Sequence, residues 1–165
     1  MNTIQRNVIA GNRTVGDRTF RFRSGFEWRW GYYLQILKNA GEIKDWDYEP
    51  RKFKFYGKDI SGSGLKGKEI GVRVYTPDFK VYERNGGITW QETKGFLDSK
   101  SYTKVKCFRQ YYPTERIELI MQRLPSYRGS ARSRNILVKL KRLEDMGVTV
   151  RDGSAIDKQM KGIMK

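Results

Sequence analysis

The first regular pattern of apolar residues in the chain has the spacing of an amphipathic helix. Its apolar positions recur at i, i+4, i+7, i+8 and i+11, and they are Phe26, Trp30, Tyr33, Leu34 and Leu37. This spacing places them on one helical face, which is then buried. Ser24 is a suitable N-cap and Gly41 a suitable C-terminal stop. We therefore predict a helix from Ser24 to about Ala40.

The pattern then changes to a period of two, which is typical of strands. Trp46 and Tyr48, and later Phe53 and Phe55, alternate with polar or charged residues. The next apolar alternation lies in Glu69–Tyr75, which we predict to be a further strand.

Two more predicted strands, Phe79–Arg84 and Ile88–Lys94, are separated by Asn85-Gly86-Gly87. The glycines of this segment allow the backbone conformation of a tight hairpin, so the two strands are expected to pair antiparallel. Side chains alternate between the faces of a strand, which places Glu92 and Lys94 on the same face.

After Gly95, Ser99 or Ser101 is expected to cap a helix that reaches about Tyr112, and residues 116–121 form another strand. The resulting order of helix, antiparallel strands, helix and strand predicts an α/β fold with a mixed central β-sheet flanked by helices. A further basic helix is expected over residues 135–146, followed by a short strand at 148–150.

These patterns suggest three parts. Residues 1–23 are a basic N-terminal arm, which either becomes ordered on nucleic acid or stays a solvated tail. Residues 24–123 are the core, and residues 124–165 are a basic C-terminal arm with one helix. Within the core, residues 57–68 form a glycine-rich loop with lysines, either a hairpin tip or a basic clamp on DNA; it lacks the ending of a phosphate-binding loop.

The charge of the chain points to a polyanionic partner. With 34 Lys and Arg against 18 Asp and Glu, the net charge is +16. Such a field favours DNA or RNA, although ribosomal proteins and proteins that bind anionic membranes share it. The sequence has no membrane-span pattern and no signal-peptide pattern, so a soluble protein of the cytoplasm is expected, that of the host cell if a phage encodes it.

The absence of histidine excludes mechanisms that need an imidazole, including His-metal nucleases and Ser-His-Asp hydrolysis. The single cysteine, Cys107, excludes an intrachain disulfide and a thiolate zinc cluster. Carboxylates and lysines are left to perform any catalysis.

Asp78 follows a Thr-Pro break, and pairing across the predicted hairpin would bring it beside Glu92 and Lys94. Two neighbouring carboxylates repel each other, and a divalent cation such as Mg2+ between them removes that repulsion. A lysine beside the cation would orient or deprotonate a water, as metal-assisted phosphodiester hydrolysis requires. Taken singly, Asp78 is better explained by a turn, and Glu92 with Lys94 by a solvated strand pair.

Glu27 has two possible roles. It occupies the third helical position after Ser24, as in a capping box. It also borders the buried helix face and could reach inward.

Three segments together resemble the bacteriophage endonuclease I family of Holliday-junction resolvases, within the PD-(D/E)XK nuclease superfamily. They are Phe22-Arg23-Ser24-Gly25-Phe26-Glu27, Tyr75-Thr76-Pro77-Asp78-Phe79 and Glu92-Thr93-Lys94-Gly95. The resemblance covers residues 20–121 and implies a restriction-endonuclease-like core. The hairpins before Asp78 and between Asp78 and Glu92 are longer than in the family, and the segment after Leu124 has no counterpart.

The resemblance implies a catalytic set of Glu27, Asp78, Glu92 and Lys94. It further implies one or two Mg2+ or Mn2+ ions per active site, held by Asp78, Glu92, Glu27 and the backbone carbonyl of Thr93. It implies a homodimer, often with exchanged N-terminal elements, that cuts branched DNA and leaves 5'-phosphate and 3'-hydroxyl ends.

We therefore expect a metal-dependent DNA endonuclease acting on four-way junctions. The alternatives are a restriction-like or transposase-associated nuclease of linear duplex, and an inactive basic nucleic-acid-binding protein. Candidate contacts to DNA phosphates are Arg13, Arg18, Arg21, Arg23, Lys100 and Lys104.

Overall fold

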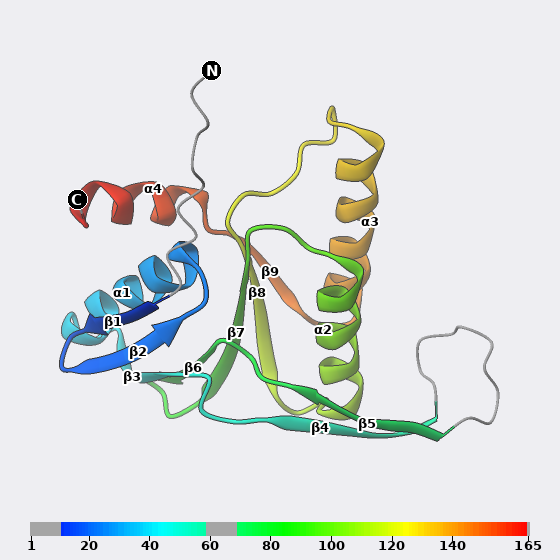
Figure 1. The fold of residues 1–165 in the computed structure, drawn as a ribbon, viewed down its shortest axis with the longest axis horizontal. Helices are drawn as coiled ribbons and strands as arrows, with labels where there is room; N and C mark the ends of the chain where they lie inside the picture. Colours follow the sequence, from blue (N-terminus) through cyan, green and yellow to red (C-terminus); the bar gives the residue numbers. More distant parts are fainter. Residues whose placement is uncertain (1–10, 59–68, 165) are drawn as a thin grey trace.

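The computed structural model describes residues 11–58 and 69–164 (Figure 1). The elements in chain order are β1 (Gly11–Val15), β2 (Arg18–Phe22), α1 (Gly25–Asn39), β3 (Ile43–Tyr48), β4 (Phe53–Lys58), β5 (Glu69–Tyr75), β6 (Phe79–Glu83), β7 (Ile88–Lys94), α2 (Ser99–Tyr111), β8 (Arg116–Met121), α3 (Ala131–Asp145), β9 (Thr149–Asp152) and α4 (Ser154–Ile163).

A five-stranded mixed sheet in the order β3-β6-β7-β8-β9 forms the centre of the fold. The pairs β3/β6 and β6/β7 are antiparallel, whereas β7/β8 and β8/β9 are parallel. The fold prediction is confirmed: this is a mixed α/β fold with a central sheet flanked by helices.

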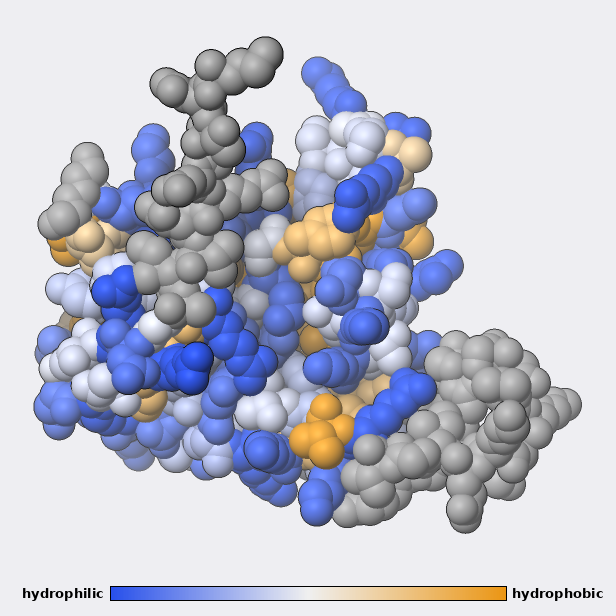
Figure 2. Space-filling view, viewed as in Figure 1, coloured by the Kyte–Doolittle hydropathy of each residue, from blue (hydrophilic) through white to orange (hydrophobic). Residues whose placement is uncertain are grey.

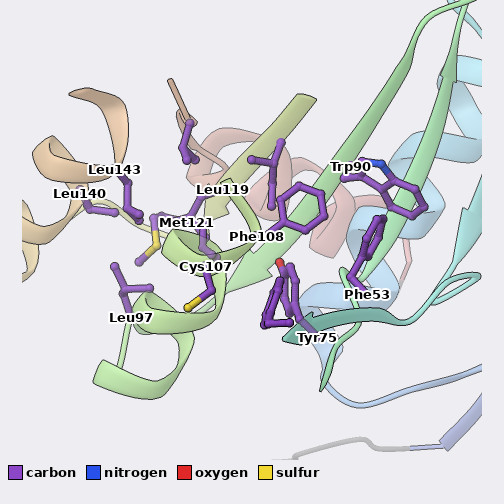
Figure 3. Packing of buried hydrophobic residues seen from close by; sticks show 14 of the residues in the cluster. Phe53, Tyr75, Trp90, Leu97, Cys107, Phe108, Leu119, Met121, Leu140 and Leu143 are labelled. Atoms are coloured by element: carbon purple, nitrogen blue, oxygen red, sulfur yellow. The ribbon is translucent and has the colours of Figure 1, made fainter. Parts of the chain in front are cut away.

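The two faces of the sheet are covered by different elements (Figure 1). On one face, α1, α4 and the hairpin β1–β2 enclose a cluster that includes Trp30 and Phe79. On the other, α2, α3 and the hairpin β4–β5 enclose a second cluster, in which Tyr75, Phe108 and Leu143 are buried (Figure 3). The sheet is therefore covered on both faces, as parallel strands require.

Gly31 lies in the middle of α1, where glycine ordinarily weakens a helix. A Cβ atom at this position would lie 3.1 Å from the Phe22 ring and 3.4 Å from the Phe79 ring. Both rings are fully buried. Glycine therefore allows α1 to approach the sheet and the hairpin β1–β2 closely.

The segment expected to be a basic N-terminal arm is in part a folded hairpin. Residues 1–10 lie outside the described residues, but β1 and β2 pair in register from Gly11/Phe22 to Val15/Arg18. Val15 and Phe22 are almost completely buried in the cluster beneath α1. The arm prediction is thus wrong for residues 11–23, because alternate residues of this basic stretch are apolar and pack on the core.

The expected C-terminal arm also belongs to the core. β9 pairs in parallel with β8, and α4 contacts α1. Leu140 and Leu143 of α3 are buried against the sheet (Figure 3). The segment has two helices, α3 and α4, rather than one. Gly153 lies between β9 and α4, where it fits closely against Phe26 and Ile120.

Smaller differences concern caps and loops. Asp98 caps α2 by accepting a 2.6 Å hydrogen bond from the Ser101 N–H. The cap is therefore neither Ser99 nor Ser101, the two serines expected from the sequence. The expected clamp loop falls largely on residues 59–68, which lie outside the described residues. Across the described part of the chain, none of the helices has the length and apolar character needed to span a membrane. Hydrophilic residues cover most of the face seen in Figure 2.

Candidate active site

The hairpin of β6 and β7 brings Asp78 to the C-terminal end of β7. Phe79 pairs with Gln91, so Asp78 lies opposite the segment that contains Glu92 and Thr93. Oδ2 of Asp78 accepts hydrogen bonds from the Thr93 N–H at 2.7 Å and from the Thr93 hydroxyl at 2.8 Å. The Asp78 side chain is almost completely buried. Its position is thus fixed by the strand that also carries the other candidate residues.

Glu92 is held by two neighbours. Its Oε1 lies 2.7 Å from Nζ of Lys94, and its Oε2 accepts a 2.9 Å hydrogen bond from the Tyr75 hydroxyl. The side chain of Glu92 is 6% exposed and that of Lys94 is 24% exposed. The carboxylate is therefore buried, whereas the ammonium group is within reach of solvent.

Glu27 combines the two roles that the sequence left open. The Ser24 hydroxyl accepts a 3.1 Å hydrogen bond from the Glu27 N–H, as expected for an N-cap. The Glu27 carboxylate is buried and accepts hydrogen bonds at Oε2 from the Arg23 N–H at 2.9 Å and from the Tyr48 hydroxyl at 2.7 Å. It therefore closes the first turn of α1 and also faces the strands.

The electrostatics link these four residues. Burial raises the pKa of Asp78 well above its ordinary value, the charges of Glu92 and Glu27 add to the increase, and Lys94 opposes it. Burial by itself lowers the pKa of Lys94, but the charges of Glu92 and Asp78 outweigh burial, so this pKa is raised. The site thus has three buried carboxylates against one lysine, and it favours additional positive charge.

Three residues near the site were not identified from the sequence. The hydroxyls of Tyr75 and Tyr48 each hold one candidate carboxylate. Burial, followed by the charge of Glu92, raises the pKa of Tyr75 well above its ordinary value, so Tyr75 is a neutral donor. Tyr48 follows the strand alternation and Tyr75 ends a predicted strand, so the sequence offered no signal that either hydroxyl binds a carboxylate.

Glu49 is the third of these residues. Its N–H donates a 2.8 Å hydrogen bond to the Asp78 carbonyl, and its carboxylate forms an ion pair with Arg23. Its φ of 47° is in the left-handed region, which is uncommon for a residue other than glycine. Burial raises the pKa of Glu49, and although Arg23 opposes the change, Glu27 and Glu92 add to it.

The donor atoms of the site suit a hard divalent cation. Among the described residues, no group of three or more His, Cys, Asp or Glu side chains is arranged to hold a metal ion. Mg2+ is, however, commonly bound through one or two carboxylates, with waters and substrate phosphates as its other ligands. The buried oxygens of Asp78 and Glu92 match that requirement.

The six candidate phosphate contacts differ in their surroundings. Arg18 forms two 3.0 Å ion pairs, with Asp45 and Asp47, and its guanidinium lies over the Trp46 ring. Those contacts favour a structural role for Arg18 rather than the expected phosphate contact. Arg13 lies over the Trp28 ring.

The other four candidates are exposed. They are Arg21, Arg23, Lys100 and Lys104, and the side chain of Arg23 is 67% exposed although it pairs with Glu49. These four residues stay candidates for contacts with a polyanion.

A solved structure described as "Structure of EndoMS-dsDNA2 complex" shares 19% sequence identity and aligns with a TM-score of 0.29, over 71% of this chain and 40% of that chain. The present chain therefore spans well under half the length of that protein. No curated protein matches the sequence significantly. The model of a family described as "Protein of unknown function (DUF1064)" matches residues 11–129, most of the chain, and the protein therefore belongs to this family.

Proposed function

We propose that this protein is a metal-dependent DNA endonuclease that hydrolyses phosphodiester bonds. The observation that supports this function most directly is the grouping of Asp78, Glu92 and Lys94 at one end of β7. Thr93 fixes the first carboxylate, and Lys94 lies 2.7 Å from the second. Buried carboxylates with an adjacent lysine are the groups that metal-assisted hydrolysis of phosphates uses.

Each residue has a proposed role. Asp78 and Glu92 would hold one or two Mg2+ or Mn2+ ions, with Glu27 and the Thr93 carbonyl as further ligands. The cation, when bound, supplies Lewis acidity and offsets negative charge at the phosphate. Lys94 orients the attacking water. The hydroxyls of Tyr75 and Tyr48 keep the carboxylates of Glu92 and Glu27 in place, because each donates a hydrogen bond to one of their oxygens.

DNA is the proposed substrate, and the charge of the chain suits a polyanion of this kind. The net charge of +16 attracts a polyanion, and the exposed Arg21, Arg23, Lys100 and Lys104 are suited to contact phosphates. The proposed products are ends with a 5'-phosphate and a 3'-hydroxyl, and the proposed site of action is the cytoplasm.

The finer proposal is a resolvase of four-way junctions that acts as a homodimer. It is supported by the three sequence segments around Glu27, Asp78 and Glu92. Two cuts across a junction need two active sites, which a symmetric dimer supplies. A nuclease of linear duplex would use the same active site and differ only in the shape of DNA that it binds.

Cleavage of a four-way junction and of a matched linear duplex in Mg2+ tests both levels of this proposal. We expect faster cleavage of the junction by the parent protein and no cleavage of either DNA by Asp78→Asn, which should still bind DNA. Asp145→Asn, at an exposed position on α3, is the control and should behave like the parent. Equal rates on the two DNAs would remove the resolvase, and an active Asp78→Asn variant would remove the nuclease site.

A further inference from the structure

A cavity lies outside the candidate active site, between the hairpin β4–β5 and α2. Its volume is about 480 Å3, which is within the range of sites that bind small organic groups. Phe55, Val74 and Cys107 supply its apolar lining. Val74 is 43% exposed at the cavity wall, whereas Phe55 and Cys107 are each 5% exposed. Val74 is therefore the solvent-exposed part of the apolar lining, with Phe55 and Cys107 buried behind it.

The charged residues that line this cavity are all basic. They are Arg73 on β5 and Lys100 and Lys104 on α2, and all three are exposed. No carboxylate of the described residues lines the cavity. An apolar surface beside cations suits a ligand that has a flat apolar part and a negative charge. A nucleotide within a strand has both parts, a base and a phosphate.

The cavity is connected to the candidate active site through two aromatic residues. The ring of Phe55 stacks on that of Tyr75, with centroids 6.4 Å apart and an interplanar angle of 23°. The Tyr75 hydroxyl in turn donates its hydrogen bond to Glu92 at 2.9 Å. Figure 3 shows Tyr75 and Cys107 within the same buried cluster. The cavity lining is thus one residue away from a candidate catalytic carboxylate.

We propose that this cavity binds an unstacked base of the DNA strand that is cut, with Arg73, Lys100 and Lys104 on the adjacent phosphates. This inference rests on the proposed nuclease function and adds a reason for preferring DNA with unpaired nucleotides. Proteins that hold single strands combine a basic groove with aromatic side chains for the bases, and Phe55 is the aromatic residue of this lining. A base that is already unpaired can enter such a cavity without the loss of pairing and stacking that a paired base would suffer.

Binding of two DNAs without metal tests the proposal independently of cleavage. One DNA is a duplex with a single unpaired thymidine, and the other is fully paired and of the same length. Val74→Asp places a carboxylate at the exposed wall of the cavity. We expect it to weaken binding of the bulged DNA by about fivefold or more, because the new carboxylate repels the phosphates and removes an apolar contact, and to change binding of the paired DNA much less.

Ile88→Asp is the matched control, because Ile88 is also an exposed apolar strand residue, at 37%, and does not line the cavity. It should leave the ratio of the two affinities unchanged. Equal weakening of both DNAs by Val74→Asp, or no weakening, would overturn the proposal. A change in sedimentation of Val74→Asp without a change in the affinity ratio would assign the cavity to contact between protein copies instead, and would also overturn it.

A second measurement uses the parent protein alone. The chain contains a single cysteine, so Cys107, which is 5% exposed in the cavity lining, is the one thiol that methyl methanethiosulfonate modifies, slowly in the protein without DNA. At equal occupancy, bulged DNA should suppress this modification and paired DNA should not; equal rates with the two DNAs would contradict the proposal. If bulged DNA protects Cys107 but the protein never cleaves DNA, the nuclease is refuted and the base site is kept. If the protein cleaves DNA but bulged DNA does not protect Cys107, the base site is refuted and the nuclease is kept.

Discussion

Thr93 donates two hydrogen bonds to a single oxygen of Asp78, one from its N–H at 2.7 Å and one from its hydroxyl at 2.8 Å. This contact joins the residue that precedes β6 to the penultimate residue of β7. It fixes a carboxylate whose pKa is raised well above its ordinary value, first by burial and then by Glu92. The same segment of β7 carries Glu92 and Lys94, so one short strand end organises the candidate site.

Tyr75→Phe should reduce cleavage while the fold is kept. The substitution preserves the ring among its buried neighbours and removes the hydroxyl that donates to Glu92. Loss of a partner that orients a metal-binding carboxylate typically costs about 10- to 100-fold in activity. Initial rates of DNA cleavage in Mg2+ and thermal unfolding measure the two effects.

The control for this substitution is Tyr112→Phe. The Tyr112 hydroxyl donates to the Lys54 carbonyl, and its ring packs in the same aromatic cluster. It should retain the parental cleavage rate. If both variants lost activity equally, Tyr75 would be a packing residue and would have no role in positioning Glu92.

Lys94→Gln should abolish most cleavage and leave DNA binding in place. The ammonium is partly exposed beside Glu92, where it can contact a water or a phosphate oxygen. Removing one such electrostatic group lowers the rate by about 100-fold or more. Lys80→Gln, on β6 beside the Tyr82 ring, is a control for loss of one positive charge. Parental rates in Lys94→Gln would exclude the proposed role.

Leu143→Ala tests whether the C-terminal segment belongs to the core. Leu143 on α3 is fully buried, so its truncation should lower the free energy of unfolding by about 2–5 kcal/mol. Val138→Ala on the same helix, at a position that is 50% exposed, should change it little. Chemical denaturation measures both variants. An unchanged midpoint in Leu143→Ala would mean that α3 is a separate arm.

Asp157→Asn should remove an acid-sensitive part of the stability. Asp157 on α4 is buried and lies 2.5 Å from Arg29 and 2.6 Å from Lys161. Burial alone would raise its pKa, but hydrogen bonds from Gln122, Lys161 and Arg29 outweigh burial and lower it. A folded pKa below the unfolded one gives stability that is present above the unfolded pKa and lost as pH falls through the folded one.

At neutral pH this substitution should cost about 2 kcal/mol, the usual contribution of hydrogen bonds to charged groups. Denaturation at neutral pH and near pH 3 measures the difference from the parent, which should shrink in acid. Asp145→Asn, in an exposed pair with Lys141, should have no measurable effect at either pH. A constant difference across this pH range would exclude a role for the ionised Asp157.

The central part of the fold could be predicted from the sequence because its signals are local. The spacing of Phe26, Trp30 and Leu34 defined α1, and the glycines after Asn85 defined the turn between β6 and β7. The same turn determined the register that places Asp78 beside Thr93. Candidate residues on paired strands are therefore accessible to sequence analysis.

The remainder depends on contacts between distant parts of the chain. The pairing of β9 with β8 leaves no mark on the local pattern of charge, whereas the burial of Phe22 under α1 is marked only by a short apolar alternation within a basic stretch. Tyr75 could not be recognised as a partner of Glu92, because a buried strand tyrosine has the same sequence signal whether or not its hydroxyl binds a carboxylate. The ion pairs of Arg18 could not be foreseen, because its acidic partners, Asp45 and Asp47, lie on another strand.

Calorimetric titration with Mg2+ and Mn2+ tests the central claim most directly, since the account requires Asp78 and Glu92 to hold a divalent cation together. The parent protein should bind the cation saturably. The double variant Asp78→Asn, Glu92→Gln should lose that binding and still unfold cooperatively. Equal cation affinity in the parent and in the folded double variant would contradict the account.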